Sequence, residues 1–397
     1  MNLLGNAAYE LLTCFWVLQS AVAVIKTRKA SRLFRDHRRW LDSGVKPHEK
    51  RRVALIIAVK GVSENFDRFL DFALGQDYPD YRVIFVTESE NDPAYLAIRE
   101  RLGGSNGASL TVAGAAVHTG QKVHNQLAAF RKLEATDRVV AFADGDLFGR
   151  TDWLSCLVLP LNLSQADFTT GYRWFIPANA SLPNRVIALI GTAIEPLIGP
   201  NWRMCLWGGS MAMTREVFEE LKIQVNLEGS INDDARISQL ARQSGKRMRY
   251  VRSVAAPSPV DFTWVSLFEF GRRQYFQLRI YQPSLWWMAL LIPLLFLASF
   301  LTCFARLGSG DFLMLILIVA AILLNLARTK ARLGYLKARF PEGEADALEA
   351  AVRGSWWLDP VVNVVHLLII VSSACGRVIV WAGIRYRVTG PQKTEIL

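Results

Sequence analysis

The sequence has little cysteine, with five in 397 residues, and the five are far apart. Their spacing matches no zinc site, and nothing in it indicates the disulfide framework that small secreted proteins use. The cysteines mostly lie in apolar stretches, at Cys14, Cys156, Cys205, Cys303 and Cys375. We therefore expect buried thiols in a reducing compartment.

A positively charged N-terminal region is also missing. The stretch from Met1 to Glu10 holds no lysine or arginine, and no clear small-residue cleavage site follows the first apolar segment. A cleaved signal peptide would have both features. The sequence therefore favours an uncleaved membrane anchor at this end of the chain.

The net charge of +11 is not arranged as a nucleic-acid-binding surface. Basic residues cluster beside the apolar segments, as in the run that begins at Lys26, and they form no stripe through the middle of the chain. We therefore expect no nucleic-acid partner. Since basic residues remain on the cytoplasmic side of a membrane, this run places the middle of the chain at the cytoplasmic face.

Long apolar segments are abundant, and 51% of the residues are hydrophobic. Four segments approach the roughly 20 residues that a bilayer span needs. They are Leu3 to Ile25, Leu285 to Leu307, Phe312 to Ala327 and Val361 to Ile384. We expect a membrane anchor over residues 1–27, a globular catalytic domain over 28–282 and a membrane region with two or three spans over 283–397.

The last apolar segment conflicts with the charge rule. A single crossing by Val361 to Ile384 would place the basic tail outside and Arg377 within the apolar stretch. This segment either re-enters the membrane or stops at its interface, and the sequence leaves both alternatives open.

The middle of the chain reads as an α/β domain. The continuous apolar run from Arg51 to Gly61 is typical of a buried parallel strand, and a second strand is expected from Arg82 to Ser89 with a helix between them. The second strand runs into acidic residues, among them Glu88 and Asp92. Because ligands of open α/β sheets bind at the carboxyl ends of strands, these acids indicate either a site or a solvated loop.

Two further patterns favour a phosphate-containing ligand. Gly120 and Lys122 precede an amphipathic helix, whose free N–H groups and nearby ammonium attract an anion. Asp144 and Asp146 follow a strand one glycine apart. Such close carboxylates repel each other unless a cation neutralises them, and Mg²⁺ or Mn²⁺ holding a diphosphate would do so. A simple turn is the alternative.

Three later segments carry candidate residues. Gly208 and Gly209 indicate a close approach of backbone to a ligand or another strand. Asp233 and Asp234 begin a helix, where they either complement its dipole or supply a general base. The basic and aromatic stretch before the second apolar segment either anchors the chain at the interface or contacts a phosphate, through Arg272, Arg273, Gln274 and Tyr275.

The apolar stretch from Arg185 to Pro200 contains one acid, Glu195. Two interpretations fit equally well. The stretch forms either an amphipathic interfacial helix that shapes the entrance for an acceptor or a buried core helix.

The order of these motifs resembles the membrane-bound inverting glycosyltransferases with a GT-A (Rossmann-like) fold, and most closely the ceramide glucosyltransferase family. The resemblance assigns the donor sugar nucleotide to Lys60, Glu88, Asp92, Lys122, Asn125 and Asp144. It assigns a divalent metal to Asp144 and Asp146, and the catalytic base to Asp234 preceded by Asp233. It assigns the acceptor and the diphosphate to Gly208, Gly209, Arg272, Arg273, Gln274 and Tyr275.

The resemblance implies transfer of a hexose from a UDP-sugar to a hydroxyl of a membrane lipid such as ceramide, with Mn²⁺ or Mg²⁺ as cofactor. A hopanoid, diacylglycerol or polyprenyl acceptor is an open alternative. So is a processive polysaccharide synthase, although four apolar segments are few for a channel. An inactive membrane scaffold of the same fold is a further alternative.

Overall fold

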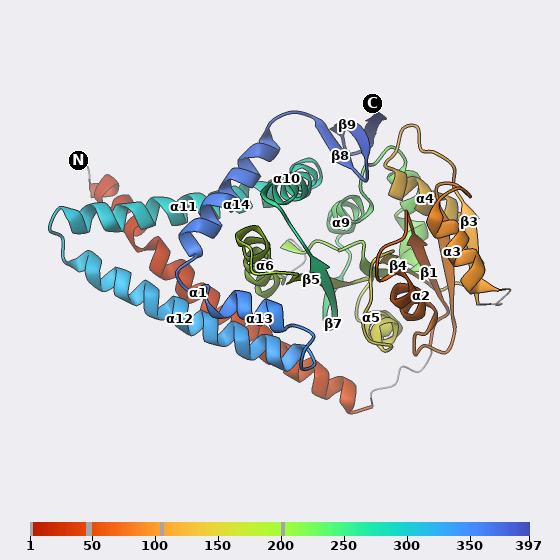
Figure 1. Cartoon of the computed structure of the whole chain (residues 1–397), viewed down its shortest axis with the longest axis horizontal. Coiled ribbons are helices and arrows are strands. Elements are labelled where there is room, and N and C mark those ends of the chain that lie inside the picture. The colour runs from red at the N-terminus through yellow and green to blue at the C-terminus, as the bar shows by residue number, and fades with distance from the viewer. Residues whose placement is uncertain (1–2, 45–49, 104–106, 200–202) are drawn as a thin grey trace.

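The computed structural model describes residues 3–44, 50–103, 107–199 and 203–397. Within them, a seven-stranded sheet forms the centre of the globular domain, with the strand order β3-β2-β1-β4-β6-β5-β7 (Figure 1). Its strands are β1 (Val53–Ala58), β2 (Tyr81–Thr87), β3 (Ala108–Val112), β4 (Val139–Asp144), β5 (Phe168–Pro177), β6 (Ser210–Thr214) and β7 (Met248–Val260). The pairing is parallel except where β6 meets β4 and β5. The expected α/β class is confirmed.

Helices cover both faces of this sheet. Side chains of β1 alternate between the two cores, so that Leu55 packs with α2 and α5, whereas Ile56 packs with α4 and α9. The helices of the domain are α2 (Phe66–Leu74), α3 (Pro93–Leu102), α4 (Gln121–Phe130), α5 (Trp153–Asn162), α6 (Leu182–Ile194), α7 (Arg215–Glu220), α8 (Ile223–Leu227) and α9 (Asp233–Gln243), with the short 3₁₀ helix η1 (Glu195–Leu197). Burial on both faces explains why the strands are almost entirely apolar.

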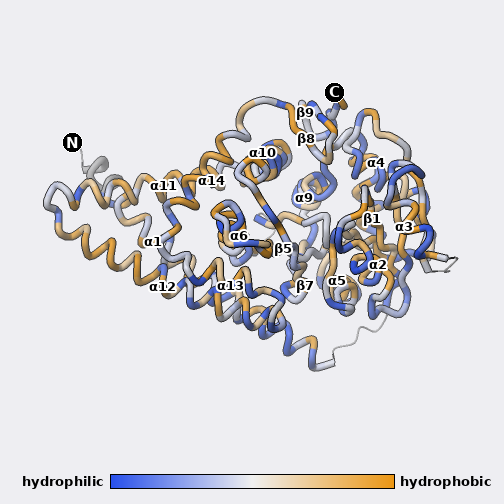
Figure 2. The backbone as a smooth tube through the Cα atoms, viewed as in Figure 1, coloured by the Kyte–Doolittle hydropathy of each residue, from blue (hydrophilic) through white to orange (hydrophobic). Residues whose placement is uncertain are grey.

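Three helices among the described residues are long and apolar enough to cross a membrane. They are α1 (Leu3–Asp42), α11 (Pro283–Gly308) and α12 (Leu313–Arg339). They extend together from one side of the globular domain, and hydrophobic residues predominate along α11 and α12 in Figure 2. The ring of Trp16 packs against Phe296 and Phe300, which ties α1 to α11. Helix α1 continues unbroken past residue 27, where we expected the globular domain to begin.

The last predicted apolar segment is not one helix. Residues Asp359–Ala374 form α14, and the chain then enters a separate three-stranded sheet, β8 (Val378–Trp381), β9 (Ile384–Gly390) and β10 (Lys393–Ile396). At about 1.5 Å per residue α14 is about 24 Å long, which is shorter than the roughly 30 Å hydrocarbon layer. It packs against α10 (Trp264–Tyr281) and α11, and the small helix α13 (Asp346–Arg353) joins it to α12.

The structure decides one open alternative and changes one expectation. Helix α6 is a core helix, because most of its side chains and the following Glu195 are buried. The end of that predicted stretch, Pro200, lies outside the described residues. Cys156 and Cys303 are buried, whereas Cys14, Cys205 and Cys375, which we expected to be buried, are exposed residues.

Candidate active site

The carboxyl ends of β1, β2 and β4 bring several predicted residues to one edge of the sheet. In the register, Ala58 of β1 pairs with Asp144 of β4, and Ala143 pairs with Ser210 of the antiparallel β6. Gly209, the residue before Ser210, therefore lies beside Asp144. Motifs that are far apart in the sequence meet here because parallel strands end at the same edge.

The two glycines lie against carboxylates. A Cβ atom on Gly209 would lie 2.4 Å from Oδ2 of Asp144, and one on Gly208 would lie 2.8 Å from Oδ2 of Asp233 and 3.1 Å from Oδ2 of Asp234. Any larger residue would displace the acidic side chains. The close approach predicted for this turn is therefore made to the aspartates, and only glycine permits it.

Lys122 connects the acidic groups. Its Nζ donates to Oδ1 of Asp144 at 2.7 Å and lies 3.4 Å from Oδ2 of Asp233. Burial alone would lower the pKa of Lys122, but the surrounding carboxylates outweigh burial and raise it. Burial would likewise raise the pKa of Asp144, but the Lys122 ammonium holds that pKa below its ordinary value. Lys122 is therefore a permanent cation within this cluster.

Asp233 and Asp234 occupy the first turn of α9, which Asn232 caps by accepting from the backbone N–H of Ala235. The Asp233 side chain is fully buried, and its Oδ2 accepts from Nε2 of Gln126 at 2.6 Å. Its Oδ1 has no hydrogen-bond partner. Asp234 instead accepts from the backbone N–H of Gly208 at 2.7 Å. The two neighbouring aspartates thus have different environments.

The environment of Asp234 raises its pKa to about 7. Burial is the main cause, and the negative charge of Asp233 adds to it. The Lys122 ammonium and the Gly208 N–H act in the opposite direction without cancelling the shift. A carboxyl group with a pKa near neutrality can both accept and release a proton under physiological conditions.

Asp146 points to a different partner from Asp144. Its Oδ2 lies 3.3 Å from a guanidinium nitrogen of Arg173 on β5, and its side chain is 54% exposed. The two aspartates that we expected to repel each other therefore each have a cationic side chain as a neighbour. Of the two, Asp146 is the more accessible to an added ligand.

One carboxylate at the site, that of Asp146, is available to a hard divalent cation. Within the described part of the chain, no group of three or more histidine, cysteine, aspartate and glutamate side chains could hold a metal. Asp146 offers an exposed carboxylate, whereas Oδ1 of Asp144 is bound to Lys122. Since Mg²⁺ commonly binds through one or two carboxylates with substrate phosphates and water, Asp146 suits such an ion when a diphosphate is present.

The donor residues at β1 and β2 divide into two groups. Nζ of Lys60 lies 3.2 Å from Oε2 of Glu88, so these two side chains meet at the strand ends. Asp92 caps α3, and its Oδ1 accepts from the N–H groups of Gly61 and Ala94. The buried Asn125 accepts from the Gln121 side chain and donates weakly to β2. Asp92 and Asn125 thus have structural contacts beside the predicted donor role.

The four residues of the Arg272 to Tyr275 stretch lie on α10 and point to different partners. Arg272 donates to the backbone carbonyls of Ser372, Cys375 and Val378, so it caps the end of α14. The Arg273 guanidinium lies 5.1 Å from the ring of Trp381 and has Nε without a partner. Gln274 is exposed, and Tyr275 hydrogen-bonds to His366. Burial lowers the pKa of Arg273, and the positive charge of Arg173 lowers it further.

Several residues at this site carry no sequence signal that we used. Gln126 fixes Asp233, Arg173 pairs with Asp146, and Tyr386 of β9 accepts a 3.2 Å hydrogen bond from the backbone N–H of Gln121 at the start of α4. The position of Gln126 one helical turn after Lys122 is a spacing that could have identified it. Tyr386 could not be found, because more than two hundred residues separate it from α4.

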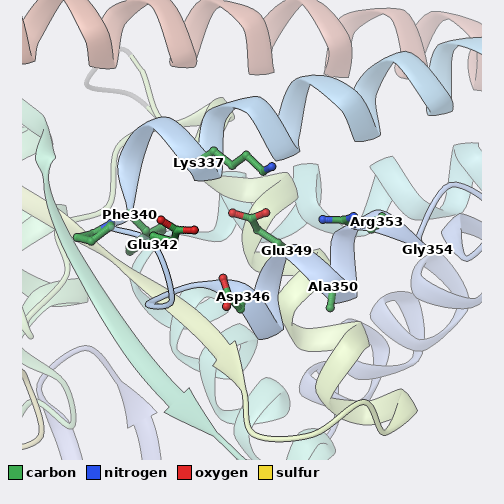
Figure 3. Close-up of a pocket in the computed structure, with 9 residues that line it drawn as sticks. Lys337, Phe340, Glu342, Asp346, Glu349, Ala350, Arg353 and Gly354 are labelled. Atoms are coloured by element: carbon green, nitrogen blue, oxygen red, sulfur yellow. The ribbon is translucent and has the colours of Figure 1, made fainter.

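A cavity of about 790 Å³ lies elsewhere, between the end of α12 and α13. Figure 3 shows its mixed lining of Lys337, Glu342, Asp346, Glu349 and Arg353. None of these belongs to the motifs at the strand ends. This cavity is therefore separate from the candidate active site.

The chain thus combines an α/β domain that has a buried acid–lysine cluster at its strand ends with helices long enough to span a bilayer. The chain belongs to glycosyl transferase family 21, whose sequence profile matches residues 12–394. It is therefore a glycosyltransferase, as the motif order predicted. No curated protein matches the sequence.

Distant similarities to solved structures also exist. The mannosyltransferase PcManGT from Pyrobaculum calidifontis, in complex with GDP-Man and Mn²⁺, is 17% identical with a TM-score of 0.48, over 92% of this chain and 98% of that one. Glucosyl-3-phosphoglycerate synthase from Mycobacterium tuberculosis, in complex with phosphoglyceric acid, is 15% identical with a TM-score of 0.41, over 58% and 79%. TarS 1–349 from S. aureus, in complex with UDP-GlcNAc, is 11% identical with a TM-score of 0.38, over 87% and 99%.

Proposed function

We propose that this glycosyltransferase moves a hexose from a UDP-sugar to a hydroxyl group of a membrane lipid, most specifically ceramide, with inversion at the anomeric carbon. The observation that carries this proposal is Asp234, a carboxyl group with a pKa of about 7 at the strand-end cluster. Family membership supports sugar transfer, and the apolar helices support a lipid acceptor.

The proposed step is a single displacement. The acceptor oxygen forms its bond to the anomeric carbon as the bond from that carbon to the diphosphate oxygen breaks, and Asp234 takes the hydroxyl proton. Asp233 is a positioning residue, because it is fully buried and bound to Gln126 and Lys122. Its charge keeps the pKa of Asp234 high enough for that carboxylate to be an effective base.

Cations on the other side of the site suit the leaving diphosphate. Arg173 lies beside Asp146, and Arg273 lies near Arg173 with its Nε unpartnered. Two guanidinium groups close together favour a ligand with more than one negative charge. A Mg²⁺ or Mn²⁺ ion held by Asp146 would neutralise additional charge on the diphosphate. Lys60 and Glu88, at the ends of β1 and β2, would contact the nucleoside.

Exposed aromatic residues support an acceptor that arrives from the membrane. Trp264 begins α10, Trp287 lies in the first turns of α11, and Trp357 lies just before α14. Tryptophan is enriched at membrane interfaces, where its ring suits the headgroup region. A water-soluble donor and a lipid acceptor would meet at such a boundary.

We further infer that residues 28–282 form the catalytic domain on the cytoplasmic face. The clusters of basic residues at the ends of α1 and α12 nearest the globular domain support this side. A reporter that is active only in the cytoplasm, fused after β10, should be active. Activity of a periplasm-type or lumenal reporter at the same position would reverse the orientation.

The function is tested with the purified full chain, radiolabelled UDP-sugars and a lipid extract. Labelled lipid is expected in the presence of Mn²⁺ or Mg²⁺, and labelled polymer would overturn the lipid assignment. Asp234→Asn should lower kcat about 100-fold or more while donor binding persists. Asp346→Asn is the matched control, because Asp346 also lies in the first turn of a helix and is exposed. Lost donor binding in Asp234→Asn would remove that residue from the base role.

A further inference from the structure

A second cavity lies against α1, and none of the residues of the strand-end cluster lines it. It has a volume of about 340 Å³ and is bounded by α1, by η1 with the residues that follow it, and by β7. We call it the α1 cavity. Its lining includes Lys26, Lys29, Leu33, Leu197, Arg249 and Arg252.

The lining of the α1 cavity is cationic. It contains two lysines and three arginines, the third being Arg203, and no aspartate or glutamate. Neither Lys26 nor Lys29 makes an ion pair within the described residues. Two lysines held close together without a paired acid favour an anionic ligand that neutralises them.

One acid, Glu195, contacts residues that line the α1 cavity, and its charge is already offset. Glu195 is fully buried and accepts from Arg252 and Tyr250, which line the cavity, and from Tyr335 on α12. Arg339 lies 3.9 Å from the same carboxylate oxygen. The Glu195 charge is therefore shared between two arginines, and it does not offset the charges of the two lysines. Arg249 donates to the neutral Gln165 side chain at 2.6 Å, so its charge is also not offset by an acid. These hydrogen bonds to Glu195 also hold the side chains of Tyr250 and Arg252 in place in the cavity lining.

Apolar side chains share the same cavity. Leu33, Leu197, Ile198 and Met204 line it together with the basic groups. Leu197 is 37% exposed, which is unusual for a leucine at the end of a core helix. A ligand with both a charged group and a hydrocarbon part would satisfy both kinds of lining, whereas a free inorganic ion would contact only one.

The position of the cavity along α1 indicates the source of such a ligand. No charged residue lies between Glu10 and Lys26, so Lys26 is the first charge after the apolar part of the helix. Lys26, Lys29 and Leu33 follow one another at intervals of three and four residues, which places them on one face. The cavity thus begins where α1 leaves its apolar stretch. This part of α1 runs beside the globular domain in Figure 1.

We propose that the α1 cavity binds the phosphate ester of an anionic membrane lipid. Lys26, Lys29 and Arg249 contact the phosphate, and Leu33 and Leu197 contact the first methylene groups of the lipid. The site is separate from the strand-end cluster, because neither Lys122 nor any aspartate of that cluster lines the cavity. The proposal depends on membrane insertion of α1 and not on the identity of the sugar or the acceptor.

The test uses the full-length protein released in detergent and native mass spectrometry, which counts bound lipids. Dioleoyl-phosphatidylglycerol and dioleoyl-phosphatidylcholine are titrated separately, and inorganic phosphate is added as a competitor. Lys26→Gln with Lys29→Gln should weaken phosphatidylglycerol binding by about 25-fold, since each basic residue near an anionic lipid contributes about a fivefold factor.

The matched control is Arg28→Gln with Arg32→Gln. Arg28 and Arg32 lie on the same part of α1, are exposed and do not line the cavity. Their substitution removes two positive charges, as the substitution of the two lysines does. The control should bind phosphatidylglycerol as the unmodified chain does. Equal weakening in both double variants would overturn the proposal, because general charge attraction would then explain binding.

Two further outcomes decide the ligand. Equal affinity for phosphatidylglycerol and phosphatidylcholine would overturn the requirement for an anionic lipid. Displacement of the lipid by inorganic phosphate at a similar concentration would assign the cavity to free phosphate and overturn the lipid source. Thermal unfolding of all variants is measured beside binding, and an unchanged Tm in Lys26→Gln with Lys29→Gln excludes misfolding as the cause.

Discussion

The Lys122 ammonium lies 2.7 Å from the Asp144 carboxylate and forms the shortest ion pair at the candidate active site. The pair joins the start of α4 to the end of β4, two elements that contribute separate motifs. The same ammonium reaches Asp233 on α9. One lysine therefore holds three elements in place while it sets the electrostatic environment of Asp234.

The first prediction concerns pH. The conjugate base of Asp234 accepts the proton, and its pKa is about 7, so kcat/KM should rise as pH increases through about 7 and level off above it. Asp233→Asn removes a neighbouring negative charge and should move this limb to lower pH, with Lys122, Asp144 and the Gly208 N–H unchanged. Initial rates over a pH series test it. A profile without an inflection near pH 7 would contradict Asp234 as the base.

Replacement of Lys122 by methionine should remove activity and lower stability. Asp144 and Asp233 would lose their common cation, and breaking a buried ion pair from one side costs about 3 kcal/mol or more. Thermal unfolding and donor titration measure the two effects. Lys132→Met is the control, because Lys132 is exposed just after α4. Equal Tm values for the two variants would show that the Lys122 pair contributes no stability.

Gly209→Ala should lower activity strongly, because the new methyl group would lie 2.4 Å from Oδ2 of Asp144 and would also meet Trp207. The carboxylate must move, and with it the contact to Lys122. Gly334→Ala serves as a control, since nothing lies within 4 Å of a Cβ there. We expect that control to be as active as the unmodified chain. Full activity of Gly209→Ala would show that Asp144 need not be held in this position.

Asp146→Ala should remove activation by Mn²⁺ or Mg²⁺. Asp146 is the exposed carboxylate of its pair, and Asp144 is bound to Lys122 and unable to replace it. Activity is measured after chelation and again after metal is added back. Asp36→Ala, an exposed aspartate on α1, controls for loss of charge. Metal activation that persists in Asp146→Ala would place the ion elsewhere.

Tyr386→Phe tests the C-terminal sheet as part of the site. The change removes one hydrogen bond to the N–H of Gln121, beside Lys122, which is worth about 1 kcal/mol. We expect kcat to fall about fivefold with donor KM little changed, because Lys122 would be held less firmly. Tyr95→Phe on exposed α3 is the control. An effect on Tm alone, with kcat unchanged, would restrict Tyr386 to a structural role.

Much of the fold follows from local pattern. The apolar run of β1 and the strand ends at Glu88 and Asp144 were predicted, because burial on both faces of a parallel sheet requires continuous apolar residues. The last apolar segment, Val361 to Ile384, was predicted as one continuous element and is in fact a helix followed by a strand. Its second half pairs as β8 with β9, and hydrophobicity alone does not distinguish an apolar strand from the end of an apolar helix.

In the candidate site, too, some features were predicted from the sequence and others were not. Asp144, Asp146 and Asp234 were identified from their positions after a strand and before a helix, which are local features of the sequence. The partners of the site's aspartates were not identified, because Arg173 of β5 and Gln126 of α4 belong to other elements. Arg272 was placed with the diphosphate, whereas in the folded chain its donors are engaged with carbonyls at the end of α14.

The sequence by itself determined the α/β class, the apolar helices and the residue types that gather at the strand ends, since these depend on periodicity and on the chemistry of single side chains. Only the tertiary structure decided which aspartate is buried and which has a pKa near neutrality. That difference depends on desolvation and on charges a few ångströms away, and both arise when α4, β4, β6 and α9 pack together.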